Sequence, residues 1–510
     1  MFSSAIAYTG LIIAYALYRW KKWHTKSRLP LPPGPKKLPL VGNLFQLPTS
    51  FEWETYAHWS EVYNSDILHV DAAGTSIIIV NSHQVAMDLF EKRSAIYSSR
   101  ALTTMIQELI KFDWLFGFMA YGEPWKERRK LFQQHFHPLD TATYQPKEQE
   151  YVHKLLKALN RTPENFIEHI RHAIGAITIT IAYGLDLKPV NDPYIEIAEQ
   201  ALIGLGAGAV PGAFLVDSIP ILKYVPSWFP GAGFKRKAAF WRKWATMLVE
   251  VPFEAAQKEI ASGTAKPSFV SACFNDLDES KDVEAQKIVI RDTAGNFFVG
   301  GADTSVSSIN TFILQMTRNP EIQAKAQAEL DRVLGPNTLP TFADEPSLPY
   351  IAAIVKEVLR WHAVTPLGVP HYLTEDDEYN GYFLPMGSIV AGNVWAILHD
   401  KNDYPDPLVF RPERFLTPDG TQLDHNVRDP LAAFGFGRRV CPGKHMATSM
   451  LYIAIASILA VFDISKAVDE EGNIIEPTGE YVSSLVSHPK PFKCSIKPRS
   501  EDAEKLISSL

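Results

Sequence analysis

Apolar residues recur every three or four positions along most of the chain, which is the spacing of amphipathic helices. Residues 84–92, 125–134 and 320–334 show this spacing, with charged residues between the apolar ones. Helical spacing continues to about residue 365, and a last amphipathic helix is predicted over 444–462. Strands and helices do not alternate in the order that a dinucleotide-binding domain requires. The pattern therefore predicts a mainly α protein.

Two stretches of β-prone residues interrupt the helical pattern. Residues 67–80 contain two such runs around a turn with Gly74, which predicts a hairpin. Short strands are predicted again over 381–390. Sheets made of so few strands are expected to be small and to lie at the periphery of the helical body.

The N-terminus departs from the amphipathic pattern. Residues 2–18 are almost all apolar, and positive charges follow at once at Arg19, Lys21, Lys22, Lys26 and Arg28. A cleaved signal peptide carries its positive charge before the apolar run, whereas Lys and Arg directly after the run hold that end in the cytosol. We therefore predict a transmembrane anchor over 1–24; a signal peptide and an interfacial helix are the alternatives.

Closely spaced prolines follow the predicted anchor. They forbid helix and favour a stiff extended segment, so residues 25–50 are predicted to be a linker. No Ser/Gly-rich stretch, charge block or internal repeat divides the rest of the chain. Residues 51–510 are therefore predicted to form one domain.

Charge and cysteine content narrow the possible functions of that domain. The 510 residues carry a formal net charge of -7 and no basic patch, which argues against nucleic-acid binding. The three cysteines, Cys273, Cys441 and Cys494, form no CxxC pair and no closely spaced framework. This argues against a disulfide scaffold and a zinc ribbon, and is typical of a reducing compartment.

One of these cysteines, Cys441, lies in a glycine-rich loop, residues 434–443, directly before the last predicted helix. Helix N-terminal amides and nearby arginines lower the pKa of a thiol, and glycines let the backbone approach a planar ligand. Arg439 can turn to a carboxylate such as a haem propionate. The alternatives are a buried free cysteine and a zinc site with His445, which lacks two further ligands. The loop predicts a thiolate that holds a haem iron.

The loop matches Phe-x-x-Gly-x-Arg-x-Cys-x-Gly, and from the anchor almost to the C-terminus the chain resembles the cytochrome P450 family. The resemblance implies a triangular prism of helices with small peripheral β-sheets, in which residues 51–510 are a haem-thiolate catalytic domain. It implies haem b as the cofactor, with Cys441 as the axial ligand of the iron. Segments 63–68 and 427–430 are similar to those of fungal microsomal members, notably mushroom enzymes of secondary metabolism.

A second motif of the family is Glu357-Val-Leu-Arg360, within the predicted helix 350–362. Glutamate and arginine three residues apart lie on one helix face and can pair, which is common in helices of any function. In the family, an arginine of a later Pro-Glu-Arg-Phe segment locks this pair, and Arg414 supplies it here. The resemblance implies that Glu357, Arg360 and Arg414 have a structural role on the haem side of the core.

A third motif, Gly300-Gly-Ala-Asp-Thr304, lies in a long helix that is predicted to begin near Val283. Glycine inside a helix costs about 1 kcal/mol relative to alanine, so a function should offset this cost. In the family, the small residues open a groove for dioxygen, and the acid and the alcohol bring protons to it. Asp303 and Thr304 are therefore the predicted catalytic residues. The alternative is that the glycines allow close packing against another helix.

Further cofactor residues follow from the resemblance alone. Trp125 and Arg129 match a Trp-x-x-x-Arg pattern that contacts a haem propionate, and His371 matches a propionate-binding histidine. Phe434 is expected to stack near the thiolate, and the amides of Gly435 and Gly437 are expected to tune its basicity. The predicted cofactor-binding set is Trp125, Arg129, His371, Phe434, Gly435, Arg439, Cys441 and Gly443.

The segments that line the substrate pocket in the family are mostly apolar in this chain, which predicts a lipophilic small molecule. Trp228 and Phe229, in a Pro-rich stretch, are predicted either to dip into the bilayer or to lie in an ordinary packed loop. The candidate pocket residues are Phe116, Phe297, Phe298, Gly301, Val364, Leu367 and Leu485.

The resemblance also implies partners and a reaction. The partners are O2, the membrane and a separate NADPH-cytochrome P450 reductase, with the anchor in the endoplasmic reticulum and the catalytic domain in the cytosol. The predicted reaction is monooxygenation of a terpenoid, steroid-like or aromatic (indole) substrate, or of xenobiotics with broad specificity. A haem-thiolate isomerase, dehydratase or peroxygenase and a haem sensor or carrier are the alternatives; the Asp303-Thr304 pair argues against them.

Overall fold

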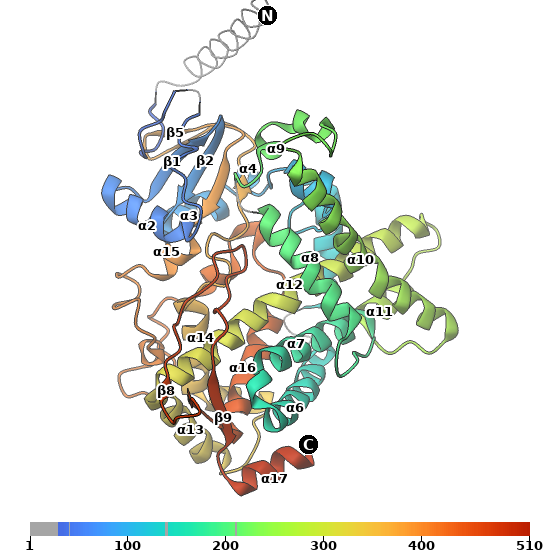
Figure 1. Cartoon of the computed structure of the whole chain (residues 1–510), viewed down its shortest axis with the longest axis vertical. Coiled ribbons are helices and arrows are strands. Elements are labelled where there is room, and N and C mark those ends of the chain that lie inside the picture. The colour runs from blue at the N-terminus through green and yellow to red at the C-terminus, as the bar shows by residue number, and fades with distance from the viewer. Residues whose placement is uncertain (1–28, 40, 138–140, 210–211) are drawn as a thin grey trace, which may run out of the picture.

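The computed structural model describes residues 29–39, 41–137, 141–209 and 212–510. As predicted, the described chain is mostly helical with small sheets (Figure 1). Its α-helices are α2 (Glu52–Tyr63), α3 (His83–Ala86), α4 (Ser94–Tyr97), α5 (Glu123–His135), α6 (Gln145–Arg161), α7 (Phe166–Tyr183), α8 (Pro193–Ala209), α9 (Leu215–Ser218), α10 (Gly233–Ser262), α11 (Phe269–Asn275), α12 (Val283–Arg318), α13 (Pro320–Leu334), α14 (Pro349–Trp361), α15 (Val394–Leu398), α16 (Lys444–Val461) and α17 (Glu501–Ser509).

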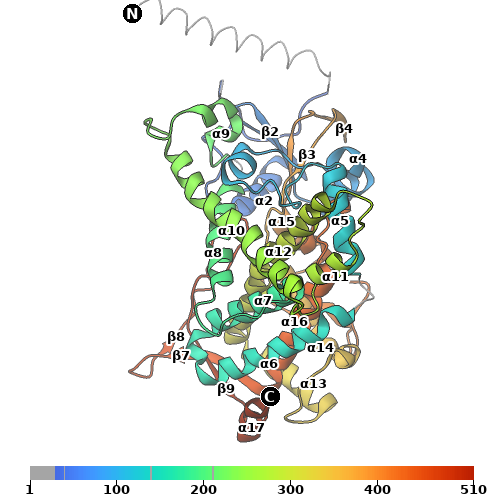
Figure 2. The ribbon, with the colours of Figure 1, turned by 90° about the vertical axis from the view of Figure 1, so that its right-hand side faces the viewer.

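Helix α12 runs through the middle of the body and organises the helices around it (Figures 1 and 2). It packs against α5, α7, α10 and α16. Most of its residues from Ser305 to Thr317 are buried, whereas an amphipathic surface helix buries only one face. The sequence predicted the start of this helix near Val283, and the structure confirms it.

The strands form three small sheets, which confirms the prediction of minor β structure. Their bounds are β1 (Ile67–Ala72), β2 (Thr75–Val80), β3 (His371–Tyr372), β4 (Asp377–Tyr379), β5 (Tyr382–Leu384), β6 (Ile389–Gly392), β7 (Phe462–Val468), β8 (Ile474–Ile475) and β9 (Cys494–Pro498). The predicted hairpin is β1–β2, with Ile67 opposite Val80. The largest sheet has the order β1-β2-β6-β3, so β6, at the end of the stretch predicted near 381–390, joins the hairpin across a long sequence separation, whereas β5 pairs with β4 in a separate sheet.

The helix predicted over 84–92 takes a different form. It is α3 followed by a π-helical turn, Met87–Lys92, in which the Arg93 amide donates to the carbonyl of Asp88. The wider turn places Phe90 at 4.2 Å from the ring of His371 and 5.6 Å from the ring of Phe436. These contacts come from strand β3 and the Cys441 loop, so local periodicity carried no signal for them.

The predicted anchor, residues 1–24, lies outside the described residues. Within the described ranges, α16 is the one helix long and apolar enough to cross a membrane, and 72% of it is buried inside the protein, so it is a core helix. The described part of the Pro-rich segment lies against the body: the amide of His69 donates to Pro33 and that of Phe383 donates to Pro30.

Helices α6 and α16 enclose a carboxyl group. Glu148 is fully buried; its Oε2 accepts a hydrogen bond of 2.7 Å from Ser449, while its Oε1 has no partner among the described residues. Burial raises the pKa of this carboxyl to about 8, although the bond from Ser449 opposes the shift. The side chain is therefore protonated in the folded protein at neutral pH.

This burial predicts a pH-dependent loss of stability. Between the ordinary glutamate pKa and pH 8 the folded state holds a proton that the unfolded state releases, so stability falls as pH rises through that window. Glu148→Gln removes the ionisable group, and the variant should lose less stability between about pH 5 and about pH 8, by on the order of a few kcal/mol. Thermal unfolding at both pH values measures this. Glu150→Gln, at an exposed site paired with Lys154, is the control. Equal pH dependence in wild type and Glu148→Gln would contradict the prediction.

Candidate active site

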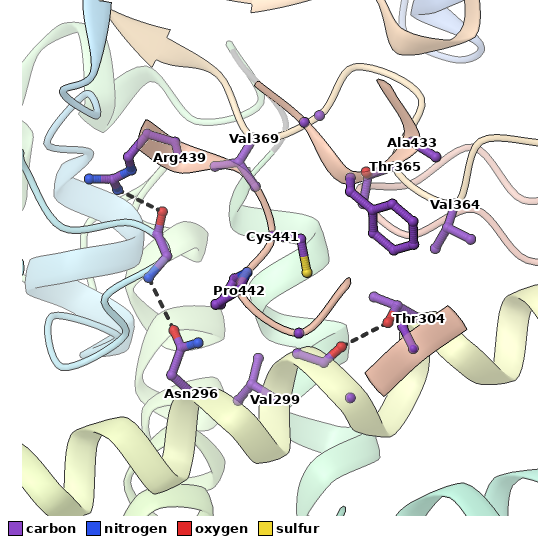
Figure 3. Close-up of a pocket in the computed structure, with 18 of the residues that line it drawn as sticks. Asn296, Val299, Thr304, Val364, Thr365, Val369, Ala433, Arg439, Cys441 and Pro442 are labelled. Atoms are coloured by element: carbon purple, nitrogen blue, oxygen red, sulfur yellow. Dashed lines mark hydrogen bonds between the residues drawn. The ribbon is translucent and has the colours of Figure 1, made fainter. Parts of the chain in front are cut away.

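A cavity of about 330 Å³ lies between α12 and the loop that carries Cys441. Cys441 extends from its loop into this space, and Asn296, Val299 and Thr304 of α12 lie across from it (Figure 3). Side chains of α5, α7 and α16 complete the walls. Fourteen of the predicted site residues line the cavity: Phe116, Trp125, Arg129, Phe297, Gly301, Thr304, Val364, Leu367, His371, Phe434, Gly435, Arg439, Cys441 and Gly443.

The loop geometry around Cys441 is set by backbone contacts. The amide of Cys441 donates to the carbonyl of Phe434 at 2.8 Å. Gly437 has a φ of +57°, and a Cβ there would lie 2.1 Å from the carbonyl oxygen of Phe90, so only glycine allows this approach. The sequence motif therefore reflects a close contact between the loop and the π-helical turn, as well as the ligand.

Burial raises the pKa of the Cys441 thiol, and the Gly443 amide and the charges of Arg129 and Lys444 oppose this without reversing it. Sequence reasoning expected the polar neighbours to prevail, because it had no measure of burial. A bound metal cation deprotonates a coordinating thiol outright. The site therefore suits a thiolate held by a metal ion rather than a free thiolate.

A cluster of buried positive groups faces the same cavity. Arg100, Arg129 and Arg439 all line it, and within the described ranges no Asp or Glu does. Nη1 of Arg439 is buried without a partner among the described residues. Burial, together with the charge of Arg129, lowers the pKa of Arg439 to about 9. Buried cations need an anionic partner, and the two carboxylates of a haem would supply one.

The walls hold these arginines rigidly through backbone carbonyls. Arg439 donates to Gly117 (3.1 Å) and Met119 (2.8 Å), and its guanidinium lies 4.8 Å from the ring of Trp125. Arg129 donates to Val440 at 2.7 Å. Since carbonyls leave the positive charge uncompensated, the residues present fit a planar dianionic ligand above Cys441.

His371 is oriented for the same task. Its Nδ1 lies 2.8 Å from the carbonyl oxygen of Tyr97, so this nitrogen carries a proton and donates to it. Burial, and then the charge of Arg100, lowers the pKa of His371 far below the usual histidine range. A neutral ring with a fixed tautomer remains at the cavity wall.

Two predicted details of the cysteine loop differ in the structure. The amide of Gly435 donates to Ala432 at 3.0 Å, and Gly437 does not line the cavity. Gly443 supplies the backbone hydrogen bond to Cys441 instead, because the chain turns into α16 directly after the cysteine. Phe434 lines the cavity, and its stacking near the thiolate stays a prediction.

The two glycines of the α12 motif have different surroundings. A Cβ on Gly300 would meet nothing within 4 Å, whereas one on Gly301 would lie 2.5 Å from Cγ2 of Thr178 on α7. Gly300 therefore opens the cavity, and Gly301 allows the close helix packing that was weighed as the alternative. The hydroxyl of Thr304 donates to the carbonyl of Gly300 at 2.8 Å.

Three predicted residues lie outside the cavity. Phe298 faces away from it, 6.4 Å from the ring of Tyr183, because neighbouring positions on a helix point about 100° apart. Leu485 packs against the hydrophobic core. Asp303 is bound to side chains on the far side of α12.

Sequence reasoning missed Arg100 and Asn296. Arg100 is the one charged residue in 96–105, an uncharged stretch that could have drawn attention to it. Oδ1 of Asn296 accepts a hydrogen bond of 3.1 Å from the Gly117 amide, and Figure 3 shows this contact continuing to Arg439. No sequence pattern indicates the Asn296 contact, because it joins α12 to a distant loop.

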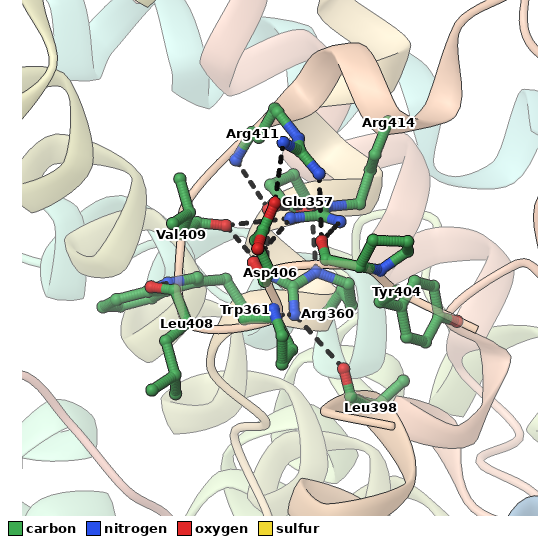
Figure 4. Close-up of polar contacts among 12 residues, drawn as sticks. Glu357, Arg360, Trp361, Leu398, Tyr404, Asp406, Leu408, Val409, Arg411 and Arg414 are labelled. Atoms are coloured by element: carbon green, nitrogen blue, oxygen red, sulfur yellow. Dashed lines mark hydrogen bonds and ion pairs between the residues drawn. The ribbon is translucent and has the colours of Figure 1, made fainter. Parts of the chain in front are cut away.

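The predicted structural triad is present and lies apart from the cavity (Figure 4). Glu357 accepts hydrogen bonds from Arg360 (2.7 and 2.8 Å) and from Arg414 (3.1 and 3.2 Å). The side chains of Glu357 and Arg360 are 0% exposed, and that of Arg414 is 4% exposed. Arg360 also donates to the carbonyls of Pro407 and Leu398. The triad joins α14 to the segment before the cysteine loop.

Comparison with known proteins identifies similar chains over nearly the whole length. The sequence model of the family Cytochrome P450 matches residues 32–496. The cytochrome P450 monooxygenase ple1 of Rhodocybe pseudopiperita is 47% identical over 504 residues, 99% of this chain and 96% of the relative. Cytochrome P450 monooxygenase 98 of Postia placenta is 48% identical, with 95% and 94% covered. Tryptamine 4-monooxygenase of Psilocybe cyanescens is 42% identical, with 98% and 99% covered.

The buried triad predicts a large cost for removing its acid. Glu357→Gln leaves the charges of Arg360 and Arg414 without a carboxylate, and breaking a buried ion pair costs about 3–5 kcal/mol. The variant should unfold at a markedly lower temperature, which calorimetry or circular dichroism measures. Glu123→Gln, at an exposed site paired with Lys126, should change the free energy of unfolding by less than about 1 kcal/mol. Equal effects of the two variants would contradict the prediction.

Proposed function

Because the chain belongs to the cytochrome P450 family and is a monooxygenase, we propose that it oxidises a neutral, lipophilic small molecule in fungal secondary metabolism. The observation that carries this proposal is the cavity above Cys441, which has apolar walls and no carboxylate among its described lining residues. The fungal origin of the similar monooxygenases supports the biological setting.

Haem b is the proposed cofactor, with Cys441 as the axial ligand of its iron. Bound there, it supplies the activation of dioxygen, which a thiolate ligand favours. Arg100, Arg129 and Arg439 would hold its carboxylates, and Trp125, His371 and Phe434 would line its binding site. Gly300 leaves room beside Thr304 for a small molecule over the iron.

The charge of the cavity supports a neutral substrate. The positive groups of the cavity are assigned to the carboxylates of the proposed haem. The part of the cavity proposed to hold the substrate is formed by apolar residues such as Phe116, Phe297, Val364 and Leu367. A protonated amine would find no carboxylate there and would bear the cost of desolvating its charge. Terpenoid, steroid-like and uncharged indole compounds are therefore the proposed substrate class.

The proposed electron source is NADPH, through a separate membrane-bound reductase, and the proposed location is the endoplasmic reticulum, with residues 1–24 as anchor, 25–50 as linker and 51–510 in the cytosol. Exposed apolar side chains support a second membrane contact: Ile221 (72% exposed), Tyr224 (75%), Trp228 (78%) and Phe229 (50%). Both views of the fold place neighbouring α9 at the end of the body where the described chain begins (Figures 1 and 2).

The proposed function is tested with the purified protein, a cytochrome P450 reductase and NADPH. A panel of neutral terpenoids, steroids and indoles should include a compound that is oxidised with NADPH consumption, and protonated amines should not be turned over. Cys441→Ala should lose this activity and the Soret band of thiolate-ligated carbonyl haem. Cys494→Ala, which alters a cysteine outside the cavity, should keep both. A normal carbonyl spectrum in Cys441→Ala would contradict the ligand assignment.

The membrane contact is tested on protein lacking residues 1–24. This variant should still bind liposomes of neutral phospholipid, since burying each exposed aromatic side chain yields about 2 kcal/mol. Adding Trp228→Ser and Phe229→Ser should weaken binding by at least about tenfold in a sedimentation assay. Val468→Ser, at an exposed site on β7, is the control. Unchanged liposome binding in the double variant would contradict the proposed second membrane contact. If deletion of residues 1–24 did not make the membrane-bound protein easier to extract with alkaline carbonate, the proposed anchor would be contradicted.

A further inference from the structure

Asp303 is bound on the side of α12 that faces away from the cavity. Its Oδ1 accepts a hydrogen bond of 3.0 Å from Arg171 of α7, and its Oδ2 lies 3.0 Å from Nε2 of His488. Its side chain is 13% exposed. Next to it in the sequence, Thr304 does line the cavity. The two partners of Asp303 are therefore the side chains through which it could receive protons for the cavity.

Only one of the two partners can transfer a proton at neutral pH. The guanidinium of Arg171 stays protonated, and its charge is shared with Glu199 of α8, whose Oε1 lies 3.0 Å from Nε of Arg171. An imidazole, unlike a guanidinium, can pass on a proton and take up another, and the side chain of His488 is 20% exposed. It therefore reaches from solvent to the buried carboxylate.

The loop that carries His488 is fixed to the same helix as Asp303. The hydroxyl of Ser307, one turn after Asp303 on α12, donates to the carbonyl of Ser487 at 2.6 Å. The amide of Ser487 donates to Val364 at 2.8 Å. These two bonds fix the loop next to α12, where the His488 imidazole lies at hydrogen-bond distance from the carboxylate of Asp303.

We propose that His488 is the residue through which solvent protons reach Asp303. The inference rests on the proposed monooxygenase chemistry and adds to it a residue outside the cavity. In this step the Nε2–H bond of the His488 imidazolium breaks and an O–H bond forms at Oδ2 of Asp303. The imidazole becomes neutral and regains a proton from solvent, and no electrons are transferred.

Proton transfer also loosens the carboxylate. Once Asp303 is neutral, it loses its ionic attraction to Arg171 and to the now neutral His488, and its side chain can turn toward the cavity beside Thr304. Before the transfer, Asp303 is held as a carboxylate. Burial raises its pKa, but the bonds to His488 and Arg171 lower the pKa on balance. His488 and Arg171 therefore keep Asp303 ionised until His488 gives up its proton.

The charged and titratable groups that face this histidine are Asp303, Arg171 and His362. His362 stacks on Tyr481 and is 2.8 Å from the hydroxyl of Ser487; burial lowers the pKa of its ring to about 3, so it stays neutral. It does not compete for protons near neutral pH. Proton supply to Asp303 should therefore decline at alkaline pH, because the path begins with protons taken from solvent.

The test uses the full-length holoenzyme with reductase, NADPH and an accepted substrate. His488→Gln keeps a hydrogen-bond donor for Asp303 but cannot transfer a proton at neutral pH. We expect product formation per NADPH to fall about tenfold or more, the solvent deuterium isotope effect to rise, and the decline at alkaline pH to disappear. His172→Gln, on α7 next to Arg171 and bonded to the carbonyl of Lys188, should leave all three unchanged.

A readout independent of turnover comes from thermal unfolding of Asp303→Asn, His488→Gln and the double variant. If the effects of the single variants on the free energy of unfolding do not add up in the double variant, the two side chains interact. If their effects on the product formed per NADPH do not add up either, the two side chains act in one path. A wild-type pH profile and isotope effect in folded His488→Gln would overturn the proposal. Additive effects of the two substitutions on both stability and product formed per NADPH would overturn it as well. Failure of the proposed function is distinguishable, because wild type would then lack the thiolate carbonyl band and substrate oxidation.

Discussion

Three arginines, Arg100, Arg129 and Arg439, converge on a buried cavity that has no carboxylate among its described lining residues. Charges removed from water need a partner of opposite sign, and here backbone carbonyls supply direction without neutralising the charge. Burial likewise keeps the Cys441 thiol protonated unless a metal cation stabilises the thiolate. The helices around α12 thus enclose a space that suits a ligand with two negative groups and a metal centre. Haem has both features.

The other buried charges of the core are satisfied within the protein. Glu357 is shared by Arg360 and Arg414, and Arg128 pairs with Asp292 at 2.7 Å. In these groups each charge already has a partner of opposite sign within the protein. They therefore belong to the framework and offer no unpaired charge to a ligand. The Asp303 pair differs from both, because one of its partners is a histidine that reaches solvent. The contrast separates structural charges from those that can bind a cofactor or move a proton.

Much of the site could be predicted because its residues lie in short, contiguous motifs. The Cys441 loop and the Gly300–Thr304 segment each combine a set spacing with a chemical requirement, and the structure brings both to one cavity. Phe298 shows where such reasoning fails: it shares its motif with Phe297, yet one residue on a helix turns the side chain to the other face. Asp303, predicted as a catalytic residue next to Thr304, is likewise bound on the side of α12 away from the cavity.

The sequence by itself determined the elements and the chemistry: the helical period, the hairpin at 67–80, a lone cysteine in a glycine-rich loop, and an acid next to an alcohol. These are local properties, which few neighbouring residues specify. Only the tertiary structure decided which groups are buried and what they touch, as with Arg100 at the cavity, Gly301 against Thr178 and His488 against Asp303. Asp303 and His488 are 185 positions apart, and burial and partner choice at such a separation depend on how the helices pack around α12.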